Sequence, residues 1–357
     1  KYRILLPFRY TLPIKWVHLG MILVTGGTGL VGAHLLFELS KDHESIKATY
    51  RNQKKIALVK KVFTYYTDQP DRLFEKITWI KANVLDVSSL GRAFHDVKKV
   101  YHAAALVSFD PKDDKKLLTT NIEGTANIVN LCIEHGVEKL CFVSSIAALG
   151  PSINGKPITE ENEWTNGSAT YAVSKHFAEM EIWRGSQEGV PAVIVNPGII
   201  VAPGFWKSSS GSFFHQAAKG PKYHLPSGTG FVGVNDVTKA MIQLMESKIV
   251  NQRYILVNQN WTHKTFAQLL AKGLKQQLPE KEIQPWMLNL FWRWDWFQSH
   301  LLGKRRKLSK AVAHLFKTRD FYDNSKIIDD LDFSYEDLEN SIEKYCSIFL
   351  TERNQGI

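Results

Sequence analysis

A tyrosine and a lysine are separated by three residues in the segment Tyr171-Ala172-Val173-Ser174-Lys175. In a helix, residues four apart share one face, so the phenol and the ammonium group are expected side by side. A nearby positive charge favours the phenolate and lowers the tyrosine pKa, which suits a general acid or base near neutral pH. Because surface helices also contain this spacing by chance, its meaning depends on the rest of the chain.

A glycine-rich segment predicts a turn that binds phosphate. It follows an apolar strand expected at Met21–Thr25 and opens a helix expected at Leu30–Ser40. Glycines let the backbone turn tightly and approach a pyrophosphate, and the helix N-terminus favours its negative charge. In this strand–turn–helix context we expect a bound dinucleotide. The contacting residues would be Thr25, Gly26, Thr28, Gly29, Leu30 and Gly32.

The end of the second expected strand, Ile46–Tyr50, indicates which dinucleotide is preferred. An acidic residue at this place would bind the ribose hydroxyls of NAD, but the chain continues with Arg51-Asn52-Gln53. An arginine can instead pair with a 2′-phosphate through charge-assisted hydrogen bonds. The sequence therefore favours NADP over NAD, with Arg51 as the discriminating residue, although a solvated loop arginine is an alternative interpretation.

Strand and helix patterns alternate through the first half of the chain. Near-continuous apolar strands between amphipathic helices predict a doubly wound parallel α/β (Rossmann) sheet covered on both faces. Ligands of such sheets bind beyond the carboxyl ends of the strands. The later expected strands are 77–80, 97–103, 139–144, 192–196 and 254–258, and the main helices are 121–135, 171–188 and 231–248.

We divide the chain into a sheet domain and a smaller, mostly helical substrate lobe. The dinucleotide domain covers 21–198 and is rejoined by about 231–260, while 199–230 and 262–345 form the lobe. Residues 333–357 look like a closing helix, of which we assign 346–357 to a C-terminal tail. Residues 1–20 contain prolines and basic residues without acids, so we expect an extension outside the fold.

Composition limits the remaining possibilities. The net charge of +10 is modest for 357 residues and does not by itself indicate nucleic-acid binding. Three cysteines without metal-ligand or disulfide spacing favour a reducing, cytoplasmic setting and predict no metal site.

Further motifs resemble the extended branch of the short-chain dehydrogenase/reductase superfamily. Ser145 ends the strand at 139–144 and precedes the Tyr-x-x-x-Lys pair. The other matching segments are Asn83-Val84-Leu85-Asp86, Val100-Tyr101-His102-Ala103-Ala104-Ala105, Asn121-Ile122-Glu123-Gly124-Thr125, Asn196-Pro197-Gly198 and Val234-Asn235-Asp236-Val237. The chain is most similar to the dihydroflavonol reductase-like and NAD(P)-dependent epimerase/dehydratase groups, although Asn83 replaces the usual aspartate.

The resemblance implies roles for individual residues. Tyr171 would move the proton of the substrate oxygen, Lys175 would bind the nicotinamide ribose, and Ser145 would hold the reacting oxygen. Buried His102 is expected to be structural. The resemblance also implies a homodimer formed by the helices at 121–135 and 171–188. Further cofactor contacts would come from Asn83, Val84, Ala103, Ala104, Ala105, Asn121, Ser144, Pro197 and Gly198.

Aromatic residues indicate what kind of substrate the protein binds. Phe109, Asn196 and Phe205 are candidate substrate contacts beside Ser145, and they favour an apolar or ring-bearing molecule. A dense group of aromatics precedes the basic run at 304–307. We favour a pocket wall or lobe cap for this group over peripheral membrane contact. Its members are Trp286, Phe291, Trp292, Trp294, Trp296 and Phe297.

The leading hypothesis is an oxidoreductase that transfers hydride between a nicotinamide and a carbonyl or alcohol. An alternative is a nucleotide-sugar epimerase or dehydratase with a tightly held NAD. A third hypothesis is a dinucleotide sensor without turnover, which the retained Tyr171 and Lys175 disfavour.

Overall fold

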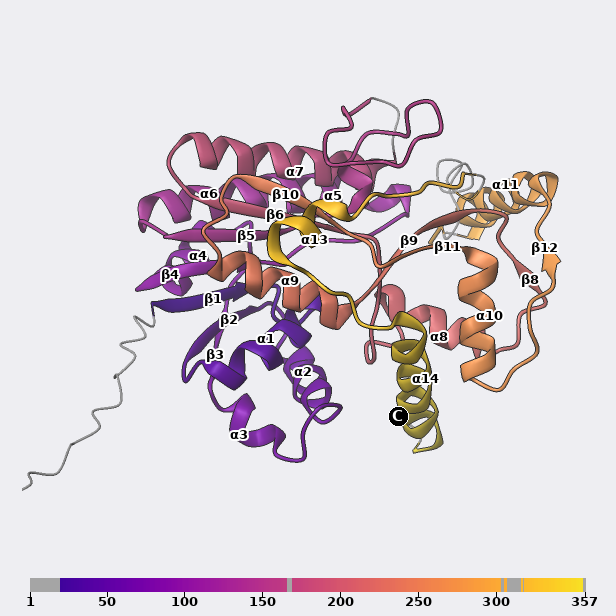
Figure 1. Cartoon of the computed structure of the whole chain (residues 1–357), viewed down its shortest axis with the longest axis horizontal. Helices are drawn as coiled ribbons and strands as arrows, with labels where there is room; N and C mark the ends of the chain where they lie inside the picture. Colours follow the sequence, from indigo (N-terminus) through magenta and orange to yellow (C-terminus); the bar gives the residue numbers. More distant parts are fainter. Residues whose placement is uncertain (1–19, 166–168, 303–304, 307–315, 317, 356–357) are drawn as a thin grey trace, which may run out of the picture.

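A seven-stranded parallel sheet forms the centre of the molecule (Figure 1). The computed structural model describes residues 20–165, 169–302, 305–306, 316 and 318–355, so the expected extension at 1–20 lies almost wholly outside the described residues. From one edge of the sheet to the other, the strands are β10 (Gln252–Leu256), β6 (Ala192–Pro197), β5 (Lys139–Val143), β4 (Val97–His102), β1 (Met21–Thr25), β2 (Ile46–Tyr50) and β3 (Ile77–Lys81).

Helices cover both faces of this sheet, as Figure 1 shows. Along β1, Ile22 and Val24 pack into one apolar core while Leu23 packs into the other, which is the alternation of a sheet buried on both sides. The first face carries α1 (Leu30–Asp42), α2 (Ile56–Phe63), α3 (Pro70–Phe74), α9 (Val234–Glu246) and α13 (Ser325–Leu331). The second face carries α4 (Val87–Phe94), α6 (Gly124–Glu134) and α7 (Thr170–Gln187), with α5 (Asp114–Leu118) packed on α7.

The predicted doubly wound sheet is confirmed, and the bounds of β1 and β2 match the expected ones. Two helices differ from the prediction. The helix expected at 231–248 begins only at Val234, because residues 231–233 belong to the strand β9 (Gly228–Gly233). The helix expected at 121–135 begins with a π-helical turn at Thr119–Glu123, and the regular α6 starts only at Gly124. Propensity does not reveal such a turn, which contains Asn121, whose tertiary contacts are described below.

The lobe has its own small sheet, in the order β11 (Gln259–Thr262), β9 (Gly228–Gly233) and β7 (Ile199–Val201). Sequence reasoning missed this sheet, because its strands are short and separated by loops. A third core joins it to three helices, α8 (Ser212–Ala217), α10 (His263–Gly273) and α14 (Leu338–Asn354). The outermost elements are β8 (Tyr223–His224), β12 (Lys281–Glu282) and α11 (Pro285–Leu302).

The C-terminal residues belong to the lobe. The assignment of 346–357 to a tail is wrong, because α14 continues to Asn354 and buries Cys346, Phe349 and Glu352. Glu352 accepts hydrogen bonds from the Tyr65 hydroxyl at 2.6 Å and the Trp206 indole at 2.7 Å. These contacts attach the last helix to the sheet domain.

The chain crosses between sheet and lobe more than once. After β6 it builds β7 and β9 of the lobe, and it then returns through α9 to add β10 beside β6. The predicted return to the sheet is therefore confirmed. Among the described residues, no helix combines the length and the apolar character that a membrane crossing needs.

Candidate active site

The glycine turn has the geometry that a pyrophosphate site needs. Gly26 has a φ of +73°, and a Cβ there would lie 2.5 Å from the Ala104 nitrogen. A Cβ on Gly32 would lie 2.3 Å from the Gly26 carbonyl oxygen, so neither position admits a side chain. The turn is followed directly by the N-terminus of α1, whose free N–H groups favour binding of an anion such as a phosphate.

Two residues predicted to contact the adenosine part of the cofactor lie at the carboxyl ends of β2 and β3. Arg51 follows β2 with an exposed side chain, which makes no hydrogen bond or ion pair in the part of the chain that the structure describes. Asn83 follows β3 and is also exposed, and its side-chain oxygen accepts a hydrogen bond from the Leu85 nitrogen. Both lie at the carboxyl ends of neighbouring strands, as predicted.

The three predicted catalytic residues are brought together at the N-terminal half of α7. Tyr171 forms a hydrogen bond with the Ser145 side chain, which lies just after β5. One turn along α7, the Lys175 ammonium donates to the Val143 carbonyl oxygen at 2.7 Å. It also lies 4.7 Å from the centre of the Phe142 ring. The sheet end and the helix thus fix one hydroxyl, one phenol and one ammonium group.

Burial controls the pKa values of this group. Desolvation raises the pKa of Tyr171 above its ordinary value, and the hydrogen bond with Ser145 only partly opposes it. The prediction that Lys175 lowers the Tyr171 pKa stays a prediction, because the contacts of the Lys175 ammonium are with the Val143 carbonyl and the Phe142 ring. Burial also lowers the pKa of Lys175 to about 8, with an opposing contribution from Glu179. Tyr171 is consequently a proton donor at neutral pH.

Sequence reasoning missed a buried acid that supports these residues. Glu179 follows Lys175 by one helical turn and is wholly buried. Its carboxylate accepts a hydrogen bond from the Asn196 amide at 2.6 Å and pairs with Arg253 of β10 at 3.0 Å. The Asn196 amide also donates to the Ser145 carbonyl oxygen at 3.0 Å. The spacing of Tyr171, Lys175 and Glu179, four residues each, was the available signal, because it puts all three on one face.

A second buried network lies behind the glycine turn. The Thr25 hydroxyl is 2.7 Å from His102 Nδ1, and His102 Nε2 is 3.0 Å from the Thr125 hydroxyl. Burial lowers the pKa of His102 to about 3, so the ring is neutral and structural, in agreement with the sequence analysis. Asn121 exchanges hydrogen bonds with the Leu106 backbone and donates to the Ser174 hydroxyl. Asn121 therefore links the segment after β4 to α7, and it lies within the π-helical turn.

The predicted substrate residues occupy different places. The Phe109 ring lies edge-on to Tyr171 with centroids 5.7 Å apart, and it is half exposed. Asn196 is wholly buried, so its predicted contact with substrate is corrected to a bracing role behind Ser145. Phe205 packs against the core that holds α1 and α2, which does not support its predicted substrate contact. Ser144 is 3% exposed, and its hydroxyl has no hydrogen-bond partner among the described residues, so its burial argues against the predicted cofactor contact.

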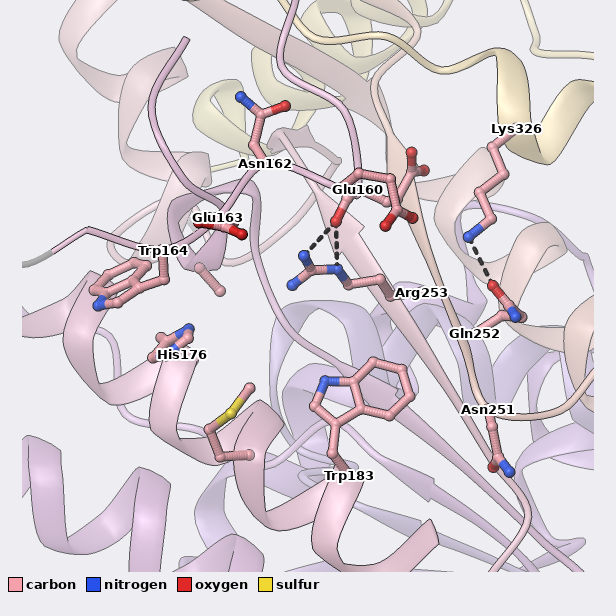
Figure 2. A pocket seen from close by; sticks show the side chains of 13 residues that line it. Glu160, Asn162, Glu163, Trp164, His176, Trp183, Asn251, Gln252, Arg253 and Lys326 are labelled. Atoms are coloured by element: carbon pink, nitrogen blue, oxygen red, sulfur yellow. Dashed lines mark hydrogen bonds between the residues drawn. The ribbon is translucent and has the colours of Figure 1, made fainter. Parts of the chain in front are cut away.

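A hollow of about 360 Å³ lies on the outer side of β10 and α7 (Figure 2). Trp164, His176 and Trp183 line one side of it, and Arg253 points into it from β10. The Arg253 guanidinium donates twice to the Glu160 carbonyl oxygen, as the dashed lines show. This hollow lies behind the Glu179–Arg253 pair. It is not the substrate pocket that the sequence analysis expected in the lobe.

The site residues fit a nicotinamide dinucleotide. The turn that excludes a side chain at Gly26, the helix N-terminus beside it and the exposed Arg51 match the pyrophosphate and ribose ends of such a molecule. Lys175 and Tyr171 lie at the neighbouring strand ends, where the reacting end would be held. The remaining predicted contacts, Thr28, Leu30, Val84, Ala103, Ala104, Ala105, Pro197 and Gly198, lie in the same segments, beside or just after β1, β3, β4 and β6.

The geometry agrees with comparisons to known proteins. The family model of the NAD dependent epimerase/dehydratase family matches residues 22–257. The chain therefore belongs to this family, and it is an NAD(P)-dependent enzyme of the extended short-chain dehydrogenase/reductase type. The predicted family and the predicted hydride-transfer chemistry are confirmed at this level.

Similar proteins include reductases. The chain is 25% identical to dihydroflavonol 4-reductase of Zea mays, with 74% of this chain and 76% of the relative aligned. It is 29% identical to sterol demethylase protein B of Methylococcus capsulatus, with 74% and 77% aligned. The structure of yeast methylglyoxal/isovaleraldehyde reductase Gre2 complexed with NADPH superimposes with a TM-score of 0.72, at 20% identity and covering 94% and 99% of the two chains.

Proposed function

We propose that the protein reduces a carbonyl group on an apolar or ring-bearing substrate and uses NADPH in preference to NADH. The observation that carries this proposal is the half-buried Tyr171, hydrogen-bonded with Ser145 and followed by Lys175 on the same helix face. Because burial keeps the phenol protonated at neutral pH, Tyr171 enters the reaction as an acid, which suits reduction of a carbonyl.

Each residue has a defined task. The Ser145 hydroxyl would orient the carbonyl oxygen, and Tyr171 would give that oxygen its proton as it gains negative charge. Lys175, held by the Val143 carbonyl, would bind the nicotinamide ribose and stabilise the phenolate that remains. When bound, the nicotinamide supplies the hydride. The Glu179–Arg253 pair would hold this end of α7 in place.

The preference for NADPH is supported by Arg51. Its exposed guanidinium follows β2, where no acidic side chain takes the place that ribose hydroxyls would use. A 2′-phosphate at this position gains charge-assisted hydrogen bonds from an arginine.

The apolar substrate is supported by Phe109, whose half-exposed ring lies beside Tyr171. The names of the relatives, dihydroflavonol 4-reductase and sterol demethylase protein B, point to ring-bearing molecules. Nucleotide-sugar epimerases and dehydratases remain the second candidate, because structures of both classes share the fold.

Oxidation of NADPH with a panel of aromatic and aliphatic aldehydes and ketones tests the proposal. Tyr171→Phe should lower kcat/KM by about 10²- to 10⁴-fold without loss of NADPH binding. Tyr101→Phe is the matched control, because this buried hydroxyl on β4 has no hydrogen-bond partner within the described ranges. Equal turnover by wild type and Tyr171→Phe would refute the mechanism, and turnover confined to nucleotide sugars would favour the epimerase or dehydratase reading.

We also propose a reducing cellular compartment and a homodimer for this protein. All three cysteines are buried and unpaired, which supports a reducing compartment such as the cytoplasm. Exposed apolar side chains on neighbouring helices, Ile133 of α6 and Phe177 and Met180 of α7, support a homodimer through these helices.

A further inference from the structure

The helix α11 carries an apolar stripe on its outward face. Its five members recur every three or four residues, and at roughly 100° per residue they fall within an arc of about 80°. Their side chains are 46 to 65% exposed. We call this set the α11 stripe: Trp286, Leu290, Trp294, Phe297 and Leu301.

The opposite side of α11 faces the protein. Leu288 and Ser299 are buried, and Trp292 and Asp295 are half-buried. An ordinary surface helix turns its apolar side inward and its polar side outward, whereas α11 exposes aromatic and aliphatic residues where charged ones are expected. The exposure also overturns the expectation that these aromatics form a pocket wall, and it shows an aligned face that their dense spacing in the sequence had concealed.

The charge around the stripe indicates what covers it. Between residues 285 and 310 the sequence contains one acid, Asp295, and six lysines and arginines. Asp295 lies on the inward side and pairs with Arg306. Three exposed polar residues flank the stripe, Asn289, Arg293 and His300, and none of them is acidic. The exposed Phe291, Trp296 and Leu302 extend the apolar surface of α11 beyond the stripe. An apolar stripe rich in tryptophan beside basic residues matches a helix that lies in the plane of an anionic membrane surface.

We propose that α11 docks the protein on the surface of an anionic lipid bilayer. The stripe enters the boundary between headgroups and acyl chains, where tryptophan rings are favoured, and the exposed Arg293 beside it faces lipid phosphates. In Figure 1, α11 lies at an outer corner of the molecule, beyond β9 and β11.

Docking also positions the active site. Arg305, just after α11, donates to the Asp113 carboxylate at 2.8 Å. Asp113 belongs to the segment that carries Phe109, whose ring lies beside Tyr171. The approach to Tyr171 is thus connected to the docked helix by one ion pair. The docking itself does not depend on the proposed reaction.

Co-sedimentation of the full chain with vesicles tests the proposal. Wild type should pellet with phosphatidylcholine–phosphatidylglycerol vesicles, bind pure phosphatidylcholine more weakly, and dissociate partly as salt is added. Each of Leu290→Gln, Trp294→Gln and Leu301→Gln should lower the partition coefficient by about tenfold. Arg293→Glu should weaken binding to the anionic vesicles only.

A matched set of exposed apolar residues elsewhere provides the control. Val87, Ile153 and Leu278 are 52, 59 and 48% exposed, and their glutamine variants should bind vesicles like wild type. Quenching of tryptophan fluorescence by brominated lipid should occur in wild type and disappear in the α11 variants. Absence of wild-type binding, or an equal loss in the control set, would overturn the proposal. So would a dimer that the α11 variants dissociate while vesicle binding stays unchanged, because the stripe would then be covered by a second copy.

Discussion

Arg253 Nη1 lies 3.0 Å from Glu179 Oε2, in an ion pair whose acid is wholly buried. The same carboxylate accepts a hydrogen bond from Asn196, whose amide also holds the carbonyl oxygen of Ser145. The edge strand β10 is thereby connected to the catalytic serine through two side chains. Burial raises the pKa of Glu179, while Arg253 and Asn196 oppose this shift.

Loss of either partner of this pair should be more costly than loss of both. Glu179→Gln leaves the Arg253 charge uncompensated and is expected to lower the free energy of unfolding by about 3–5 kcal/mol. The double variant Glu179→Gln/Arg253→Met should recover most of that loss. Urea unfolding of wild type, the single variants Glu179→Gln and Arg253→Met, and the double variant gives the coupling energy between the two side chains. The exposed pair of Glu38 and Lys41 is the control, where Glu38→Gln should change stability by less than about 1 kcal/mol. Additive losses would show that the pair is not coupled.

The charge of Lys175 should limit turnover at high pH. With a pKa of about 8, Lys175 loses its charge as the pH rises through that value, and turnover should fall. Glu179 raises the Lys175 pKa, so Glu179→Gln should shift this alkaline limb to lower pH. The groups near Lys175 that could share the titration are Tyr171, whose pKa is raised, and neutral His102. A pH–rate profile measures the limb, and superimposable profiles would contradict the role given to Glu179.

Lys175 should reduce stability even though the reaction needs it. Its pKa falls from 10.5 to about 8 on folding, so the unfolded chain binds more protons between these values. Stability therefore rises as the pH increases from about 8 to 10.5, and below 8 the burial costs up to about 3 kcal/mol. Lys175→Met should raise the free energy of unfolding at pH 7 and abolish turnover. Chemical denaturation at pH 7 and pH 10 checks both the sign and the window.

His102 should make the fold sensitive to acid. Its pKa falls from 6.5 to about 3 on folding, so stability is present above 6.5 and is lost as the pH falls toward 3. The expected slope is about 1.4 kcal/mol per pH unit for this one residue. His102→Gln should flatten the slope by that amount, whereas His95→Gln, at an exposed position, should not. His34, whose pKa is lowered to about 4, contributes in the same direction and remains in both variants.

Arg51 should decide the choice of cofactor. Arg51→Glu replaces the cation that would pair with a 2′-phosphate by a carboxylate that repels it. The Kd for NADPH should rise by about 10- to 100-fold, while the Kd for NADH changes little or falls. Titration of intrinsic fluorescence measures both constants. Lys54→Glu, nearby and also exposed, is the control for a general charge effect, and equal changes in the two variants would exclude a specific role for Arg51.

Local sequence patterns were sufficient to predict the central sheet and the Tyr171–Lys175 pair. β1 is a short buried apolar run, and β2 alternates apolar with polar residues; both lie next to turn residues, so their bounds could be read directly. The glycine turn and the Tyr171–Lys175 pair depend on spacing within one or two elements, which a sequence displays. The structure brings them to one edge because the carboxyl ends of parallel strands meet there.

Features that depend on distant contacts could not be predicted. A glutamate on an amphipathic helix is ordinarily solvated, and only the arrival of Arg253 from β10 makes Glu179 a buried support. Asn196 was predicted to contact substrate, but it lies within β6 and its side chain turns inward to Glu179. In α11 apolar residues occur on every side of the helix, so the sequence does not show which side faces outward, whereas the burial of Leu288 and Ser299 does.

The order of strands in the sheet has a consequence for synthesis of the protein. Because N-terminal segments leave the ribosome first, α7 with its buried acid is complete before β10 exists. A nascent chain that stops before β10 contains the whole Tyr-x-x-x-Lys motif but lacks the cation that neutralises Glu179. The segment with the Tyr-x-x-x-Lys motif therefore cannot reach its final structure alone. It requires Arg253, which is translated later with β10.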